Sequence, residues 1–392
     1  MTQQIAVWNG RMRSLDCLPR TKAKKFPRLI RAVLQVALLI TAAMLQNACV
    51  ESPDRTTPVG RTFVAFVDDE RQSWIGAEKR PLHTTVWYPA ISGVQETQWT
   101  VGIFQAGWSA KDAAMVDLPR KLPLVVLSHG TGGASAQVSW LAEHLASNGY
   151  LVAAVNHHGN TAAEDQYAPQ GFMLWWERAR DLSVVIDKVI ADPRFGQRVD
   201  SNRIVAGGFS LGGYSVLALA GARTNFAEWR DYCERTPDDT GCTTPPEAQF
   251  SLDDLNRLAV EDDRTKDSFA SAGHSYRDRR VKAVYAIAPV LRAAFDTDSL
   301  EKISIPVRLT VGSEDRQAVP ELNAYPLKVA IPRASLRELP QVGHYTFLAP
   351  CNIQGKLLVS QLCVDESGID REEVHQQVAT DALNFFARVL DT

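Results

Sequence analysis

The stretch Asn202-Arg-Ile-Val-Ala-Gly-Gly-Phe-Ser-Leu-Gly-Gly-Tyr214 joins a β-branched apolar run to a serine flanked by glycines and then to small residues. This order predicts a strand, a sharp turn at Ser210, and a helix over 211–222. Gly208 and Gly212 leave space where a Cβ would meet neighbouring backbone, and Ser210 would sit in a strained conformation with its hydroxyl pointing outward. The stretch therefore indicates a nucleophile elbow.

A glycine-rich turn after a strand also occurs in inert loops and in phosphate-binding nucleotide folds, so the pentapeptide alone decides little. Two later residues favour the elbow. Asp315 follows a predicted strand at 306–311, and His344 follows one at 334–339. Strand ends in a doubly wound sheet meet at one edge, so Ser210, Asp315 and His344 are expected to converge, in the chain order Ser, Asp, His.

These three residue types form a working set for nucleophilic catalysis. A serine hydroxyl is a poor nucleophile at neutral pH, so Ser210 needs a base, and His344 is the candidate. The imidazole in turn needs a carboxylate to fix its tautomer, which we assign to Asp315. Taken alone, His344 would be interpreted as a loop histidine bonded to backbone, but its position and the chain order favour catalysis.

The acid has two adjacent candidates, Glu314 and Asp315. Asp315 is preferred, since Glu314 starts one residue earlier after the strand and would point differently from the turn. If neither carboxylate holds the histidine, Asp296 or Asp298 is the next candidate.

A second glycine-rich loop follows the predicted strand at 122–127, with the sequence Ser128-His-Gly-Thr-Gly-Gly133. Its residues carry few side chains that could obstruct backbone N–H groups. The N–H groups of Thr131 and Leu211 are the candidate oxyanion donors. The same glycines would also suit a plain strand-to-helix turn, and the two interpretations are compatible.

Strand and helix patterns alternate through most of the chain, which predicts an α/β fold with a mostly parallel, doubly wound sheet and helices on both faces. The segment 223–280 breaks the alternation with many charges and one predicted helix at 252–260, and is interpreted as an inserted lid. Two earlier strands, at 61–67 and 82–88, are expected to be antiparallel edge strands. The strand expected at 122–127 is more uniformly apolar, as a strand buried on both faces of a parallel sheet should be, and further strands are expected at 150–155, 203–206, 281–287, 306–311 and 334–339.

The first 48 residues have the layout of a signal peptide: basic residues precede an apolar run at 32–45 that is too short for a comfortable membrane span. A polar linker at 49–60 and a catalytic domain at 61–392 would follow. Leu45-Gln-Asn-Ala-Cys49 resembles a bacterial lipobox but departs from it at Gln46. Lipidation of Cys49, with a membrane tether, is favoured over plain secretion.

The six cysteines support export. Cys17 would leave with the signal peptide and Cys49 would be lipidated, which leaves an even set of four. Cys233 is expected to pair with Cys242, and Cys351 with Cys363, because each pair closes a short loop in an oxidising compartment.

The charge balance of the chain bears on the kind of partner it binds. Without residues 1–48, the chain has 34 basic and 44 acidic residues, which argues against a nucleic-acid surface. No cofactor motif was found. His157 and His158 lack the third ligand of a zinc site and are expected to shape the pocket instead. Trp175 and Trp176 are expected in the core rather than in the acyl site.

Four motifs together resemble the α/β-hydrolases, and within them the group of predicted dienelactone hydrolases, which is similar to platelet-activating-factor acetylhydrolases. The motifs are Ser128–Gly133, Asn156-His-His-Gly-Asn-Thr161, Gly208–Tyr214 and Gly343-His-Tyr345, and the resemblance covers roughly residues 60–390. Dienelactone hydrolases proper use a cysteine nucleophile, whereas this chain has Ser210. The resemblance thus implies the fold and the catalytic set, with a carboxylic ester as the expected substrate.

The expected function is an exported serine esterase that works through an acyl-enzyme, without metal or cofactor. A phospholipase-like or polyester-cleaving hydrolase is the alternative within enzymes. A non-catalytic cell-surface binding module is the alternative from another class, because hydrolase folds are reused in that way. Such modules usually lack a catalytic residue, and here the full set is present.

Overall fold

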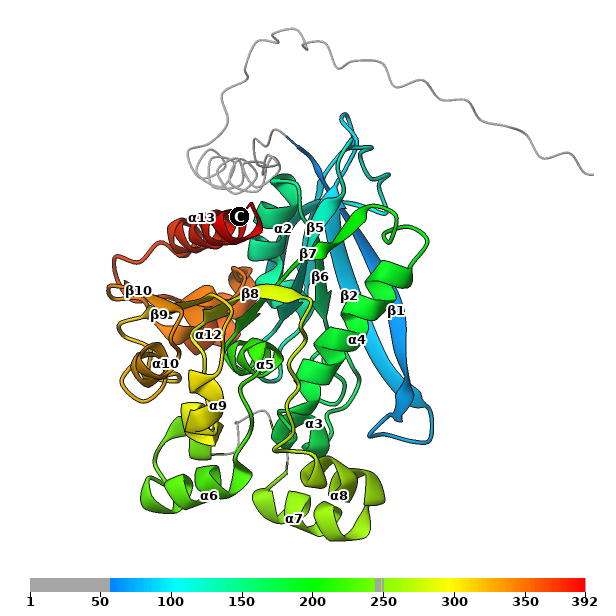
Figure 1. Ribbon diagram of the computed structural model, residues 1–392. Helices are drawn as coiled ribbons and strands as arrows, with labels where there is room; N and C mark the ends of the chain where they lie inside the picture. The colour runs from blue at the N-terminus through cyan, green and yellow to red at the C-terminus, as the bar shows by residue number, and fades with distance from the viewer. Residues whose placement is uncertain (1–56, 244–247, 249, 392) are drawn as a thin grey trace, which may run out of the picture. The chain divides into compact units, whose positions relative to one another are not determined.

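The computed structural model describes residues 57–243, 248 and 250–391. Strands of this part form one sheet in the order β10-β9-β8-β7-β5-β6-β2-β1-β4-β3 (Figure 1). The run from β10 to β6 is parallel, and β2 and β1 continue it in antiparallel pairing. The strands are β1 (Val59–Gln72), β2 (Lys79–Pro89), β3 (Thr97–Val101), β4 (Phe104–Lys111), β5 (Leu122–Ser128), β6 (Leu151–Val155), β7 (Val199–Phe209), β8 (Val281–Ile287), β9 (Val307–Gly312) and β10 (Ala334–Leu339).

Helices lie between the strands and cover both faces of the sheet (Figure 1). This arrangement is the predicted doubly wound α/β fold. The α-helices are α2 (Ser139–Ser147), α3 (Pro169–Met173), α4 (Glu177–Ala191), α5 (Leu211–Ala220), α6 (Phe226–Arg235), α7 (Leu252–Glu261), α8 (Asp263–Ala270), α9 (Thr297–Glu301), α10 (Ala324–Ala330), α11 (Ile353–Leu358), α12 (Ser360–Cys363) and α13 (Arg371–Leu390). The short 3-10 helices are η1 (Ser135–Val138), η2 (Thr240–Cys242), η3 (Arg292–Ala294) and η4 (His344–Phe347).

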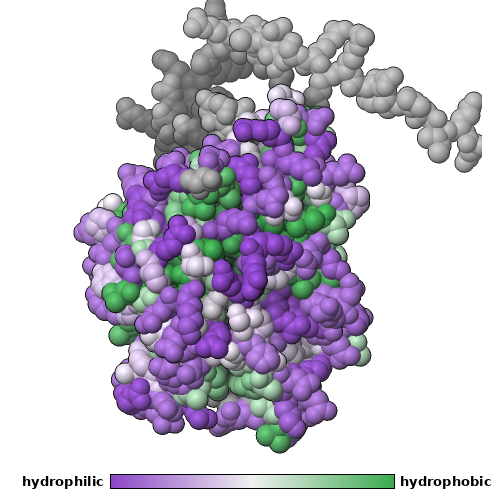
Figure 2. Space-filling view, in the orientation of Figure 1, coloured by the Kyte–Doolittle hydropathy of each residue, from purple (hydrophilic) through white to green (hydrophobic). Residues whose placement is uncertain are grey.

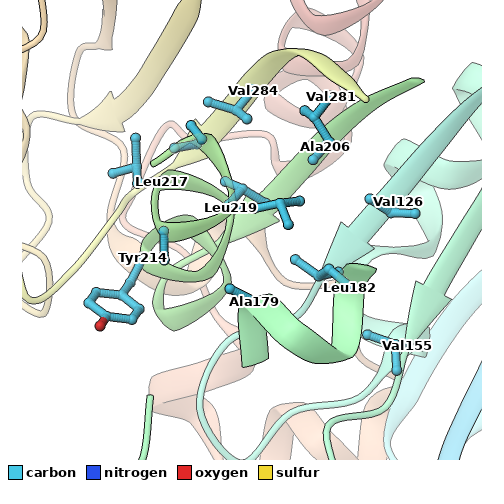
Figure 3. Close-up of a cluster of buried hydrophobic side chains, with 14 of the residues drawn as sticks. Val126, Val155, Ala179, Leu182, Ala206, Tyr214, Leu217, Leu219, Val281 and Val284 are labelled. Carbon is cyan, nitrogen blue, oxygen red and sulfur yellow. The ribbon is translucent and has the colours of Figure 1, made fainter. Parts of the chain in front are cut away.

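Two apolar layers hold the fold, one on each side of the sheet. On one side, α4 and α5 pack against the central strands, and Figure 3 shows Leu182 of α4 and Leu217 of α5 in this layer. On the other side, α2 and α13 cover β5, β7 and β8. Every residue of β5 is buried, as expected for a parallel strand covered on both faces. The central strands are therefore fixed firmly, and the loops at their C-terminal ends start from rigid positions.

The outer surface is more polar than these layers. Figure 2 shows one face of the molecule, on which hydrophilic side chains predominate and apolar side chains form separate small patches. Among the described residues, no helix combines the length and the apolar character needed to cross a membrane.

The expectation that the first two strands lie at the sheet edge was wrong. β1 and β2 are antiparallel, but the hairpin of β3 and β4 lies outside them, and β4 pairs with β1 at Gly60 and Arg61. The hairpin escaped detection because β3 is short and largely exposed and β4 is mostly half-buried, so neither strand shows clear apolar alternation. β1 also begins at Val59, inside the predicted linker at 49–60.

The segment 223–280 holds more structure than the one helix expected. It contains α6, η2, α7 and α8, and the three α-helices gather at one end of the molecule, at the bottom of Figure 1. α7 was predicted at 252–260 and occupies Leu252–Glu261, and its N-cap Ser251 accepts a hydrogen bond from the Asp254 N–H. α6 and α8 are short and strongly charged, so their periodicity was too weak to detect.

Candidate active site

Ser210 lies at the turn between β7 and α5, in the backbone conformation that the sequence predicts. Its φ is 55° and its ψ is −118°, a region that residues with a side chain rarely adopt. A Cβ added at Gly208 would lie 2.1 Å from the Gly212 carbonyl oxygen, and one added at Gly212 would lie 2.0 Å from the Ser128 carbonyl oxygen. Only glycine fits at these two positions, so the turn depends on Gly208 and Gly212 having no side chain.

The structure brings Ser210, His344 and Asp315 together from three strand ends. The Oγ of Ser210 lies 3.0 Å from Nε2 of His344, and Nδ1 of His344 lies 2.7 Å from Oδ2 of Asp315. An ionised carboxylate accepts, so Nδ1 carries the proton and Nε2 is free to accept the serine proton. All three residues are nearly buried, which limits competition from water.

Asp315, rather than Glu314, reaches the histidine. The second oxygen of Asp315, Oδ1, accepts hydrogen bonds from the N–H groups of Gln317 at 2.9 Å and Ala318 at 2.6 Å. These bonds hold the carboxylate in one orientation. Glu314 is exposed, and the backbone N–H of Glu314 donates to the Val342 carbonyl. This contact ties the acid loop to the loop that carries His344.

The alternative acids lie elsewhere. Asp296 accepts a 2.7 Å hydrogen bond from Arg223, and Asp298 lies in the first turn of α9. Neither makes a hydrogen bond to His344 among the contacts of the described residues.

The predicted oxyanion donors flank the serine. The loop after β5 lies against the elbow, since a Cβ added at Gly130 would be 3.2 Å from the Ser210 Cβ. Within the described part of the chain, the N–H groups of Thr131 and Leu211 donate to no protein acceptor. Both residues line the same pocket as Ser210. These two backbone N–H groups, next to the Ser210 hydroxyl, could donate hydrogen bonds to a negatively charged oxygen that forms there.

A pocket of ≈ 390 Å³ opens beside Ser210. Aromatic side chains form much of its wall, and its lining has no Asp, Glu, Lys or Arg among the described residues. Such a wall favours an uncharged, largely apolar group. The lining aromatic residues are Tyr167, Phe172, Trp175, Phe209, Trp229 and Tyr345.

Several residues of the pocket wall were not predicted from the sequence. Trp175 and Trp176 are both buried in the core as expected, but Trp175 also lines the pocket. Trp229 and the segment 240–243 reach the pocket from the inserted segment. Thr240 Oγ1 donates to the Gln317 carbonyl at 2.6 Å, so the inserted segment also touches the loop of the acid. No periodicity marks these contacts.

Both predicted disulfides, Cys233–Cys242 and Cys351–Cys363, are present, with Cα–Cα distances of 5.3 and 5.4 Å. Each lies next to the pocket: Cys242 lines it directly, and Leu362 lines it beside Cys363. The disulfides therefore fix two parts of the pocket wall.

His157 and His158 do not line the pocket, so the expectation that they shape it was wrong. His157 Nε2 lies 2.8 Å from Ser128 Oγ, and His157 Nδ1 lies 2.9 Å from Asp181 Oδ2. His158 lies 2.8 Å from Glu164. Among the described residues, no group of three or more His, Cys, Asp or Glu side chains is arranged to hold a metal ion.

A buried network of charges lies behind the oxyanion loop and was not predicted. Asp181 accepts hydrogen bonds from Arg71 at 2.6 Å and from Arg80 at 2.8 Å. Burial alone would raise the pKa of Asp181, but the two guanidinium groups lower it well below its usual range. Arg178 Nη2 donates to the His129 carbonyl oxygen. Little in the sequence indicates this network, because Arg178 and Asp181 lie on the same helix, α4, as the apolar residues that pack against the sheet.

Parts of the chain match known protein families and curated proteins. Residues 71–173 match the family model for platelet-activating factor acetylhydrolase, isoform II, and residues 136–227 match that of the prolyl oligopeptidase family. Cutinase 2 of Thermobifida cellulosilytica is 33% identical over 101 residues, which are 25% of this chain and 34% of that protein. A cutinase of Thermobifida fusca is also 33% identical, over 25% of this chain and 28% of its own length.

The chain thus spans about a third of the length of the curated relatives that it matches. One solved structure matches this chain over a much larger share of its length. The ferulic acid esterase from Streptomyces cinnamoneus superposes with a TM-score of 0.60 over 87% of this chain and 93% of its own, at 22% identity. This likeness supports the fold that the sheet order indicates.

Proposed function

We propose that this chain, an α/β-hydrolase by its fold and family matches, is a serine hydrolase that cleaves carboxylic esters. The observation that carries the proposal is the chain of contacts from Ser210 through His344 to Asp315 at a strained elbow beside an apolar pocket. The relatives named cutinases and the structural neighbour named a ferulic acid esterase support the reaction class.

The proposed reaction has two halves. Ser210 Oγ attacks the ester carbonyl carbon while His344 Nε2 takes its proton, and the N–H groups of Thr131 and Leu211 stabilise the negative oxygen. The intermediate collapses to an acyl-enzyme, and His344 gives its proton to the departing alkoxide. Water then attacks the acyl-enzyme, with His344 as base, and releases the carboxylic acid and free Ser210.

The pocket suggests the kind of acyl group. Its aromatic wall without charged side chains favours an uncharged group, because a charge there would lose its hydration without a partner. A p-nitrophenyl ester series of increasing acyl length, with the matching p-nitroanilides, tests the proposal. We expect ester turnover that falls for chains too long for the pocket, and anilide turnover far lower. No turnover of any ester would contradict it.

A phospholipase-like or polyester-cleaving activity is the second candidate within the same chemistry. The match of residues 71–173 to the platelet-activating factor acetylhydrolase model supports the first, and the cutinase relatives support the second. Release of fatty acid from phospholipid vesicles and of monomer from a polyester film, measured with equal enzyme, separates them from simple esterase activity.

We also propose that the protein is exported and tethered through lipidated Cys49. The two disulfides support an oxidising compartment, and residues 1–56 lie outside the described part of the structure. The intact mass of protein isolated from its cells tests this. A mature N-terminus at an unmodified residue other than Cys49 would favour plain secretion.

A further inference from the structure

The loop that offers Thr131 is held by a side chain outside the pocket. His129 is fully buried and does not line the cavity, whereas Gly130, Thr131 and Gly132 do. The imidazole of His129 turns back onto its own loop, and its Nδ1 lies 2.7 Å from the Gly130 carbonyl oxygen. This contact involves the peptide unit that carries the candidate oxyanion donor.

The partners of the ring fix its tautomer. The backbone N–H of His157 donates to Nε2 of His129 at 3.1 Å. Because Nε2 is an acceptor, the proton of the neutral ring is on Nδ1, and Nδ1–H donates to the Gly130 carbonyl. Burial, and then the nearby charge of Arg178, lower the pKa of His129 well below its usual range, so the ring stays neutral.

One peptide unit joins the Gly130 carbonyl to the Thr131 N–H. A trans peptide is planar, so its C=O and N–H point in opposite directions, and the described chain has no cis peptide bond. The carbonyl points inward to His129, and the N–H therefore points away from it, on the side where Thr131 lines the pocket. A hydrogen bond to the carbonyl also polarises the unit and makes its N–H a stronger donor.

His129 itself is anchored on a second side. Its backbone carbonyl accepts a hydrogen bond from Arg178 Nη2, and Arg178 is fully buried on α4. The next turn of the loop is held too, because the Gly133 N–H donates to the Gly130 carbonyl at 3.3 Å. The loop therefore has little freedom to rotate the Gly130–Thr131 peptide as long as the His129 contact is present.

We propose that His129 is a positioning residue that holds the Gly130–Thr131 peptide with the Thr131 N–H directed at the oxyanion. This inference rests on the proposed function, since it assigns a role within that same reaction. A donor aimed at charge that develops only in the transition state acts on kcat more than on KM. A side chain that merely stabilised the loop would act on folding stability and leave the kinetics of the folded enzyme unchanged.

The test compares three substitutions in the full chain. In His129→Asn, the amide nitrogen occupies the place of Nδ1 and retains the donor. In His129→Gln, the amide nitrogen occupies the place of Nε2, so the donor is lost, and His129→Leu removes all polar atoms. We expect kcat to fall about 10- to 100-fold in His129→Leu and His129→Gln, less than a lost oxyanion donor would cost, with KM within about threefold. His129→Asn should recover most of the loss.

Inhibition by phenylboronic acid supplies the second measurement. Its tetrahedral adduct with Ser210 places an oxygen where the oxyanion forms, so the inhibition constant should rise in parallel with the fall in kcat. His158→Leu is the matched control, because His158 is also buried and hydrogen bonded but does not line the pocket. It should lower stability and leave kcat and the inhibition constant unchanged.

The outcomes separate the inference from the proposed function. If phenylboronic acid fails to inhibit the unmodified enzyme, or inhibits Ser210→Ala equally, the proposed function is wrong. If the enzyme is inhibited through Ser210 but His129→Gln matches His129→Asn in kcat and in the inhibition constant, the role of His129 is only structural. If His129→Leu does not fold, the Asn and Gln variants make the same comparison.

Discussion

Two chains of contacts run from a serine through a histidine to an aspartate within the part of the protein that the structure describes. In one, Ser210 to His344 is 3.0 Å and His344 to Asp315 is 2.7 Å. In the other, Ser128 to His157 is 2.8 Å and His157 to Asp181 is 2.9 Å. We call them the pocket array and the buried array. The distances in the two arrays are similar and do not distinguish them. A serine, a histidine and an aspartate in hydrogen-bond contact are therefore not enough to identify the serine as a nucleophile.

Three physical differences separate the arrays. Ser210 has a positive φ and lines the pocket, whereas Ser128 ends β5 and is fully buried. The aspartate of the pocket array is held by two backbone N–H groups, but Asp181 is held by Arg71 and Arg80. Burial lowers the pKa of His157 to about 3, and the charge of Arg178 adds to this effect. An imidazole with that pKa is too weak a base to activate a serine at neutral pH.

The comparison teaches that backbone strain, access to the pocket and free N–H donors favour Ser210 over Ser128 as the proposed nucleophile. The pocket array has all three, since Thr131 and Leu211 offer their N–H groups beside Ser210. The buried array is interpreted as structural, because it links β5 to α4 behind the oxyanion loop.

The largest expected effect separates the two serines. Ser210→Ala should reduce ester turnover by at least about 10⁴-fold, because the remaining donors have no nucleophile to assist. Ser128→Ala should keep turnover within about tenfold. The initial rate of p-nitrophenyl ester hydrolysis measures both. Equal losses in the two variants would contradict the assignment.

The two acidic residues of the acid loop provide the next comparison. Asp315→Asn should lower kcat about 10³- to 10⁴-fold, because His344 would adopt the wrong tautomer. Glu314→Gln should cost less than about tenfold, since Glu314 is exposed and makes no described contact with the histidine. Steady-state kinetics of both variants test the pair, and the reverse ranking would move the role to Glu314.

Asp181→Asn should show the opposite profile to Asp315→Asn. It leaves Arg71 and Arg80 buried without their shared carboxylate, and breaking a buried pair costs about 3–5 kcal/mol. Denaturant unfolding should show this loss, while the folded fraction retains kcat within about tenfold. Asp315→Asn should change the free energy of unfolding by about 1 kcal/mol or less. A large loss of kcat in folded Asp181→Asn would mean that the buried array takes part in catalysis.

Acid should destabilise the fold through the buried histidines. Burial lowers the pKa of His157 and His375 to about 3, and that of His129 well below its usual range. Below about pH 6.5 the unfolded chain therefore binds protons that the folded chain does not. The free energy of unfolding should fall towards pH 3 by up to about 1.4 kcal/mol per pH unit for each histidine. Denaturant unfolding of Ser210→Ala at several pH values between 7.5 and 4.5, roughly the range over which histidine titrates, tests this. A free energy of unfolding that does not change with pH over this range would contradict it.

Much of the fold could be predicted because the central strands are short, apolar and separated by helices. β8 and β10 have the predicted bounds: β8 is buried along most of its length, and β10, the edge strand, is mostly half-buried but has buried residues at both ends. The hairpin of β3 and β4 could not be found, because β3 is largely exposed, β4 is mostly half-buried, and neither shows clear apolar alternation. Local sequence pattern predicts elements that are buried, and it is weak where tertiary pairing alone makes the strand.

The candidate site divides in the same way. Ser210, Asp315 and His344 could be proposed because each follows a strand in a topology that gathers strand ends. The pocket wall could not, because Trp229 and Thr240 reach the cavity only through the packing of the inserted segment. The buried array was missed for a related reason: it depends on Arg71 and Arg80, from the distant strands β1 and β2, reaching Asp181 on α4.

The most direct test of the central claim is to map the site of labelling by an organophosphonate ester probe. The probe phosphonylates an activated serine, so peptide mass spectrometry of the labelled protein identifies the nucleophile. We predict a single label on the peptide of Ser210, unchanged in Ser128→Ala and absent in Ser210→Ala. A label on Ser128 or on any other serine, or labelling that persists in Ser210→Ala, would contradict the account.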